Sequence, residues 1–391
     1  MRVLLSLIVS FGVWMATLLA VQAQEDDKGF LTRAIQDALS GAGREVRIDG
    51  FQGALSSSAS FDQMTIADAT GVWLTLRNVE LVWTRSALLR GRLEVESLTA
   101  DQLDIPRLPL ADAGALPAAE AAPFRLPSLP VSIDITAFDV RKINLGAPLL
   151  GEAAQLRVSA SASYSEAVAN VDIQARRTDA KQGVFAIRAN LERSTDVLDL
   201  LIQLNEGAGG MAARVLDVPG LPSVTMSVKG AGPLDEFSTD VRIATDGQER
   251  LAGRVTLGTQ APRRPSDPPD QRIQAQIGGD ITALVAPRYR AFFGTDMQLS
   301  LDARRTADGA LDVNTFALRT QAASLQGQMG LDADRWPSLI DITGVIATPD
   351  ATPVLLPLSQ DATTAERVDL RIRFDAAEGD ALNATFDLRD L

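Results

Sequence analysis

The sequence predicts a mostly β protein in which an elongated, curled sheet carries an apolar groove. Apolar and polar residues alternate with a period of two over most of the chain, as in half-buried strands. Helical spacing is confined to short stretches, too few to cover the apolar face of so many strands. Hydrophobic residues form 46% of the chain and aromatic residues only 5%, so small aliphatic side chains would leave that face open rather than filled. A stack of sandwiches is the alternative, which periodicity alone does not exclude.

Residues 1–23 are predicted to be a signal peptide or a signal anchor helix. The stretch from Val3 to Val21 is almost continuously apolar, and about 18 residues is just long enough to span a bilayer. Small residues at Val21 and Ala23 resemble a cleavage site, so cleavage and retention both stay open. Acidic residues follow at Glu25-Asp26-Asp27. Because positive charge stays on the cytoplasmic side, the body of the chain is expected outside the cytoplasm.

Residues 24–105 are interpreted as an amino-terminal β module with a leading helix. The helix is predicted from Phe30 to Ser40, where apolar residues recur at helical spacing and two glycines follow. Residues 106–130 contain six prolines around an alanine-rich centre, which predicts a loop or linker.

Residues 131–391 are interpreted as a continuing β-groove region. Turn pairs such as Asp246-Gly247 and Asp308-Gly309 separate its alternating runs. Prolines make a loop of Gln260–Gln271, since proline donates no ladder hydrogen bond. Short helices are predicted at Arg85–Arg90, Gly210–Leu216 and Ile281–Phe293, the last being the strongest. The alternating runs are Val171–Ala175, Phe185–Leu191, Leu198–Leu204, Val224–Val228, Leu251–Leu257, Met297–Ala303, Leu325–Leu331, Ile340–Ile346, Val368–Phe374 and Leu382–Leu388.

The apolar positions of three of these runs are the candidate binding residues. An uncovered apolar face of more than a few hundred Å² usually marks a binding surface, and acyl chains could lie along it. Strand alternation places the candidates on one face and their sequence neighbours on the other. The lipid-groove candidates are Leu200, Ile202, Leu299, Leu301, Leu370 and Ile372.

Composition excludes most other chemistries. The chain has no Cys and no His, which removes disulfides, thiolate nucleophiles, the Ser-His-Asp arrangement and the commonest metal ligands. A net charge of −13 argues against nucleic acid as a partner. No phosphate-binding glycine motif follows a strand. We therefore expect no enzyme activity, no catalytic residues, no cofactor and no metal.

One block of sequence resembles a known family. It opens with Gly50-Phe51-Gln52-Gly53-Ala54-Leu55-Ser56-Ser57 and closes with the basic, leucine-rich stretch from Val82 to Arg92. Over Phe30 to Pro109, and more loosely at Lys229–Leu234 and Gly278–Gly294, the chain resembles the TamB-type translocation and assembly module proteins of the AsmA-like superfamily.

This resemblance implies a function in the cell envelope. TamB-type proteins have an inner-membrane segment and a periplasmic, taco-like β-sheet with an apolar interior. The family supports outer-membrane protein and autotransporter assembly, and thereby protein secretion, with a TamA-type outer-membrane β-barrel, and it moves phospholipids between the two membranes. The barrel docks at the far carboxyl end of longer chains. The resemblance therefore implies that this sequence is an amino-terminal portion without that docking region.

Two other functions remain open from the sequence. One is a structural or adhesive periplasmic β-protein without lipid handling, which would have sealed cores. The other is a periplasmic hydrolase on a β-solenoid, which would gather carboxylates in a cleft. The first interpretation instead requires an apolar face that continues across consecutive strands.

Overall fold

The computed structural model describes residues 45–53, 56–110, 132–261, 269–348, 350, 352–356, 364–377, 379 and 383–389. The predicted signal or anchor segment 1–23 and the helix Phe30–Ser40 lie outside these residues, as does most of the loop 106–130. Within the described ranges, no helix is long and apolar enough to cross a membrane.

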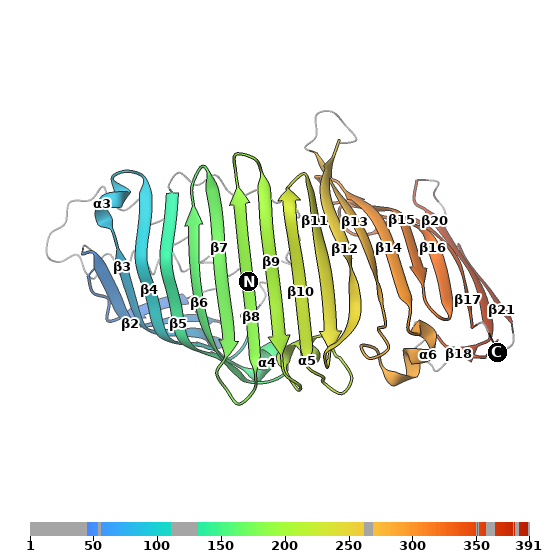
Figure 1. Cartoon of the computed structure of the whole chain (residues 1–391), viewed down its shortest axis with the longest axis horizontal. Coiled ribbons are helices and arrows are strands. Elements are labelled where there is room, and N and C mark those ends of the chain that lie inside the picture. Colours follow the sequence, from blue (N-terminus) through green and yellow to red (C-terminus); the bar gives the residue numbers. More distant parts are fainter. Residues whose placement is uncertain are drawn as a thin grey trace. The chain divides into compact units, whose positions relative to one another are not determined.

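The described residues are mostly β, as the alternation predicts, and within each unit the sheet is open and curled (Figure 1). They divide into two compact units, which we call unit 1 and unit 2, and the division falls between Ser194 and Thr195. Unit 1 contains β1 (Glu45–Asp49), β2 (Ser58–Asp68), β3 (Gly71–Trp83), β4 (Arg92–Ile105), β5 (Ser132–Leu145), β6 (Ala154–Tyr164), β7 (Val168–Arg177) and β8 (Gly183–Glu192).

Neighbouring strands of unit 1 pair in chain order, and all these pairs but one are antiparallel. The exception is β4 with β5, which run parallel. A parallel pair needs a connection that returns to the starting end, and the proline-rich segment after Ile105 makes it. The described start of this segment is fixed, because the Arg107 guanidinium binds the Asp68 carboxylate at 2.7 Å. That hydrogen bond holds the pKa of Asp68 well below its usual range.

Unit 2 is a run of antiparallel neighbours from β9 to β17, followed by β20 and β21. The turn Asp246-Gly247 has positive φ at both residues, 51° and 74°, which is the tight hairpin geometry that this pair predicts. The strands are β9 (Val197–Glu206), β10 (Val224–Pro233), β11 (Glu236–Thr245), β12 (Gln248–Gln260), β13 (Asp270–Gly279), β14 (Met297–Arg305), β15 (Leu311–Arg319), β16 (Ala323–Leu331), β17 (Pro337–Ala347), β20 (Arg367–Asp375) and β21 (Asn383–Arg389), and a short separate pair joins β18 (Val354–Leu355) to β19 (Thr364–Ala365).

The described helices are short and lie between strands. Two of the predicted ones are present, as α3 (Arg85–Leu88) and α5 (Met211–Val215), and α4 (Ala147–Leu150) was not predicted. The helix predicted from Ile281 to Phe293 is wrong in length: only a 3₁₀ turn, η2 (Pro287–Tyr289), and α6 (Arg290–Phe293) form. Proline at 287 explains the difference, because the residue before it is extended, with ψ of 141° at Ala286.

Buried apolar side chains gather differently in the two units. In unit 1 a single cluster extends from Val46 of β1 to Ile143 of β5. In unit 2 the two clusters lie near strand ends, one around Phe292 of α6 and one around Ala213 of α5. Among the described residues of unit 2, the second sheet is only the two-stranded pair β18–β19, whose Ala365 packs with Ile346 and Val368 near the strand ends. No larger sheet in the described residues covers the apolar face, as stacked sandwiches would require. The middle of that face is the region of interest for function.

Candidate functional site

The strand register brings all six lipid-groove candidates onto one face of unit 2. Residues directly opposite each other in a sheet share a face, so the register defines rows that run across the strands. Row 1 contains Ile202, Leu299 and Leu370, and row 2, next to it, contains Leu200, Leu301 and Ile372. From β9 to β20, row 1 is Ile202, Val228, Val241, Gly253, Ile277, Leu299, Leu318, Leu325, Gly344 and Leu370. Row 2 is Leu200, Gly230, Thr239, Val255, Ala275, Leu301, Phe316, Gly327, Ile342 and Ile372.

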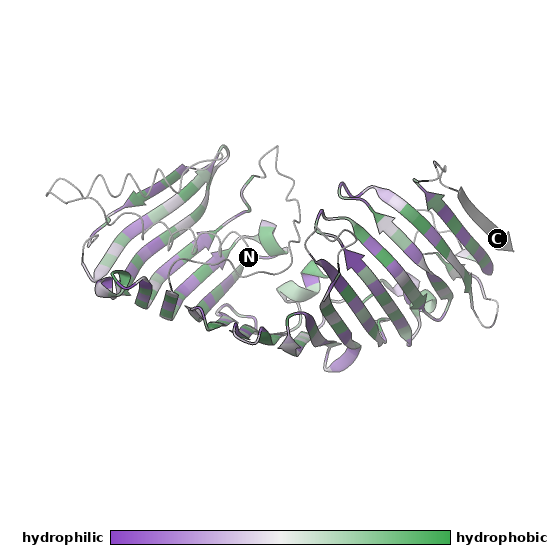
Figure 2. Ribbon diagram, turned by 90° about the horizontal axis from the view of Figure 1, so that it is seen from above, coloured by the Kyte–Doolittle hydropathy of each residue, from purple (hydrophilic) through white to green (hydrophobic). Residues whose placement is uncertain are grey.

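The two rows are only half-buried, and they are apolar apart from Thr239, whose hydroxyl donates a hydrogen bond to the Val255 carbonyl oxygen at 3.3 Å. Every residue of rows 1 and 2 has an intermediate exposure, except Ala275, which is buried. Their sequence neighbours Gln203, Ser300 and Arg371 point to the other face and are exposed. Figure 2 shows this alternation as green and purple bands along each strand. A sealed core would bury such leucines and isoleucines almost completely. The face is therefore apolar across consecutive strands without being filled from above by described residues.

Glycines in these rows show toward which face the sheet bends. A Cβ atom on Gly253 would lie 2.2 Å from the Gln276 carbonyl oxygen and 2.6 Å from Ile277 Cα, on the next strand. A Cβ atom on Gly327 would lie 2.2 Å from the Asp341 carbonyl oxygen. Since these missing Cβ atoms would project from the apolar face, the neighbouring strand is folded toward that face. Glycine at such points permits sharp sheet curvature. The curl of unit 2 thus places the apolar rows on its inner side.

Unit 1 has a similar apolar face that the sequence interpretation did not include among the candidates. One of its rows runs from Phe61 to Phe185 across seven strands in register. Its central members are well buried, with 5% exposure at Val79 and 3% at Val140, so here the face is largely covered by its own cluster. The sequence feature that indicates this face is the alternation of apolar and polar residues in β7 and β8. The full row is Phe61, Val79, Ala100, Val140, Val158, Ala175 and Phe185.

The opposite face of both units carries cross-strand ion pairs. Each joins an arginine of one strand to an aspartate of its neighbour, and most of the side chains involved are well exposed. Such pairs contribute little individually, up to about 1 kcal/mol, but they favour the observed register because a slip would separate the charges. The pairs are Arg141–Asp101 at 2.5 Å, Arg157–Asp139 at 2.5 Å, Arg188–Asp172 at 3.0 Å, Arg254–Asp240 at 2.9 Å and Arg272–Asp302 at 2.6 Å.

A hollow of about 470 Å³ lies over strands β13 to β16. Of its twelve lining residues, eight alternate onto the polar face, and the other four belong to row 1. The eight are Gln276, Gly278, Gln298, Ser300, Ala317, Arg319, Ser324 and Gln326. We therefore assign this hollow to the polar face, behind row 1, rather than to the apolar face itself.

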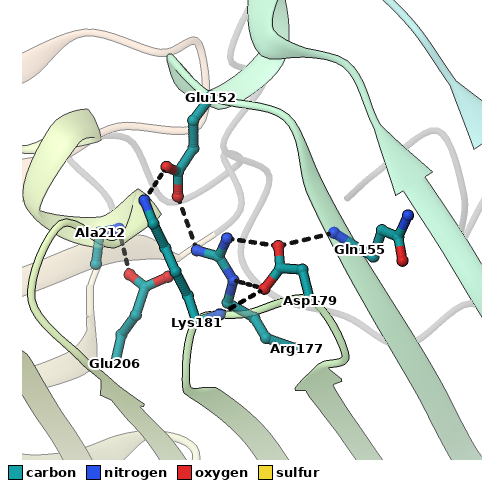
Figure 3. A network of polar contacts seen from close by, with 7 residues as sticks. All are labelled: Glu152, Gln155, Arg177, Asp179, Lys181, Glu206 and Ala212. Atoms are coloured by element: carbon teal, nitrogen blue, oxygen red, sulfur yellow. Dashed lines mark hydrogen bonds and ion pairs between the residues drawn. The ribbon is translucent and has the colours of Figure 1, made fainter.

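A buried ionic network lies at the end of β7 (Figure 3). Arg177 ends β7 on the apolar face, and its side chain is only 2% exposed. It binds Glu152 at 2.8 Å and Asp179 at 2.7 Å, and Lys181 also binds Glu152. Burial alone would raise the pKa of Glu152, but the hydrogen bonds from Lys181 and Arg177 outweigh it and lower that pKa. The Arg177 hydrogen bond is the main reason that the pKa of Asp179 is also lowered.

This network should make unit 1 sensitive to acid. Because the folded-state pKa values are lowered, the stabilisation is present above the ordinary carboxyl values of about 4 and is lost as pH falls through the lowered values. At neutral pH, Glu152→Gln should reduce the free energy of unfolding by about 1–3 kcal/mol. Below about pH 4, the free energies of unfolding of the variant and of the unmodified protein should become more similar. Urea unfolding at several pH values measures both effects.

The exposed pair Arg188–Asp172 provides the control, with side chains 60% and 38% exposed. Asp172→Asn should cost less than about 1 kcal/mol. An equal loss in the two variants, or a Glu152→Gln loss that does not change with pH, would contradict the structural role of the network.

A second buried carboxylate belongs to unit 2. Glu206 ends β9, is 2% exposed, and accepts a hydrogen bond from the Ala212 backbone N–H at 2.6 Å (Figure 3). It thereby satisfies one of the free N–H groups at the start of α5. The arrangement is structural, and a side chain at Gly210 would force Glu206 to move, since a Cβ there would lie 2.2 Å from the Glu206 carboxyl carbon.

The described residues contain no group of three or more His, Cys, Asp or Glu side chains that could hold a metal ion. Asp68, Glu152 and Asp179, whose pKa values are lowered, are each paired with an arginine or a lysine. Comparison with protein family models, with curated proteins and with solved structures finds no match to this chain. The features of this chain that point to a function are therefore the apolar rows and the sequence resemblance.

Proposed function

We propose that this protein is a bridge-like component of the cell envelope that handles lipid in an apolar β-groove, as the resemblance to TamB-type proteins implies. In this proposal rows 1 and 2 form the floor of the groove, and phospholipid acyl chains lie along it. The body is in the periplasm and is associated with the inner membrane. In this proposal the protein supports outer-membrane protein and autotransporter assembly together with a TamA-type β-barrel.

The observation that supports the proposal is the continuity of the half-buried apolar rows from β9 to β20. Acyl chains have no polar groups to satisfy, so a surface without hydrogen-bond donors or acceptors is the complementary one. Within a sheet, most backbone groups along this surface are already paired with neighbouring strands, apart from irregularities such as the one between Val313 and Phe316. A structural or adhesive protein would have no use for an apolar face of this length, since it invites aggregation.

Photo-crosslinking in cells tests the proposal directly. A photoreactive residue at Leu200, Leu299 or Leu370 should capture phospholipid, because these positions lie on the apolar face. The matched controls are Gln203, Ser300 and Arg371, which lie on the same strands but point to the polar face. Capture at the first set and not at the second is the expected result, read by mass spectrometry of the crosslinked adducts. Equal capture at both sets, or none at either in folded protein, would contradict lipid binding in the groove.

A further inference from the structure

The turn between β3 and β4 carries an unusually exposed leucine. Leu89 is 87% exposed, the highest value among the exposed large hydrophobic residues of the described chain. A lone exposed leucine needs no explanation in general. Here, however, the turn around it is fixed rather than loose, so the exposure is a property of the fold.

Three features hold this turn in place. Ala87 is fully buried and Leu88 half-buried, which fixes α3 against the sheet. Backbone hydrogen bonds then close the turn, from Arg90 N–H to the Ala87 carbonyl at 2.9 Å and from Gly91 N–H to the Leu88 carbonyl at 3.0 Å. Gly91 takes a φ of 68°, a conformation that favours glycine. Leu89 is thus presented outward at the end of the strands.

The same turn is locally basic in an acidic protein. Residues 85–92 contain Arg85, Arg90 and Arg92 and no acidic residue, whereas the whole chain has a net charge of −13. Arg85 and Arg90 are exposed, and Arg92 pairs with Glu94 at 2.8 Å. An exposed apolar side chain between cationic ones matches a surface that is negatively charged outside and apolar beneath. The surface of an anionic phospholipid membrane has this chemistry.

We propose that the α3 turn, residues 84–91, contacts the surface of an anionic membrane, with Leu89 entering the headgroup region and Arg85 and Arg90 binding lipid phosphates. Two cations and one leucine give weak binding by themselves. The contact is therefore weak in the isolated chain, where it is measured at high lipid concentration, and in the cell it adds to the association with the inner membrane. This inference rests on the membrane-associated location in the proposed function, but not on lipid binding in the groove.

The absence of native cysteine gives a direct test with the full chain. Leu89→Cys provides a single thiol for an environment-sensitive fluorophore, and Gln203→Cys, an exposed site on β9, provides the control. With vesicles of phosphatidylcholine containing phosphatidylglycerol, the probe at position 89 should shift to the blue and be quenched by nitroxide-labelled lipids. The probe at position 203 should do neither. Adding Arg85→Gln and Arg90→Gln to the Leu89→Cys protein should raise the lipid concentration that gives half of the fluorescence response by about tenfold or more.

The outcomes separate this inference from the proposed function. No shift at position 89, an equal shift at position 203, or an equal response with pure phosphatidylcholine vesicles would overturn the membrane contact. Crosslinking of phospholipid at Leu299 in the Arg85→Gln/Arg90→Gln variant should be unchanged within twofold if the groove acts as proposed. Failure of the groove would remove that crosslink and leave the fluorescence shift in place.

Discussion

Replacing Leu299 by aspartate should abolish phospholipid passage along unit 2 while leaving the fold intact. Leu299 stands in row 1, with apolar row members Ile277 and Leu318 directly opposite on the neighbouring strands. A carboxylate there has no described cation opposite it, and an unpaired charge facing acyl chains costs several kcal/mol or draws in water. Either outcome interrupts the apolar path. Transfer of fluorescent phospholipid between donor and acceptor vesicles, with the purified protein, should fall at least about tenfold.

Ser300→Asp is the matched control, because the adjacent side chain lies on the exposed polar face of the same strand. It should transfer lipid at the rate of the unmodified protein. Circular dichroism and urea unfolding establish that both variants are folded. If Leu299→Asp unfolds unit 2, then Leu299→Gln, which adds polarity without charge, should still reduce transfer severalfold. Normal transfer by a folded Leu299→Asp protein would exclude a path across row 1.

Substituting Gly253 by alanine should strongly destabilise unit 2, although the change adds a single methyl group. Ile277, its partner in row 1, comes so close that the new Cβ atom would lie 2.6 Å from Ile277 Cα. Backbone on a neighbouring strand cannot move aside as a flexible side chain can. We therefore expect a loss of about 2–3 kcal/mol or more in the free energy of unfolding, measured by urea denaturation.

Gly258 lies on the same strand and faces the other side, where the closest atom to a new Cβ would be the Asp235 carbonyl oxygen at 3.1 Å. Gly258→Ala should cost less than about 1 kcal/mol. This comparison separates the effect of close strand approach from the general cost of side chains on β12. Similar losses in the two variants would mean that the bend at Gly253 is not tightly constrained.

The sequence predicts the faces of this protein well and its register poorly, for a physical reason. Successive strand residues point to opposite sides, so alternation alone assigns Leu200 and Gln203 to different faces. Which residue of the next strand stands opposite depends on turns and bulges, and rows 1 and 2 therefore emerge only from the structure. Gly253 is visible as an interruption of an apolar run, but its close approach to Ile277 depends on the partner strand.

Other differences also come from context beyond local pattern. The apolar spacing from Ile281 to Phe293 is helical, yet Pro287 divides it and most of it forms no helix. The α3 turn is predicted from its leucines and arginines, whereas the 87% exposure of Leu89 depends on how Ala87 packs. The Arg177 network joins residues from separate segments, and no local motif indicates it. Burial and long-range pairing are the properties that a single sequence does not carry.

The antiparallel meander of unit 2 has a consequence for how such a protein changes in size. Each strand adds one residue to each row, and neighbouring strands are about 4.8 Å apart. Duplicating one hairpin would therefore lengthen the apolar surface by about 10 Å and leave its chemistry, its width and the direction of its curl unchanged. Deleting a hairpin would shorten it by the same step. The distance that such an apolar surface can bridge therefore changes in steps of one hairpin. Duplication of a coding segment can adjust this distance, and no new binding residue has to be selected.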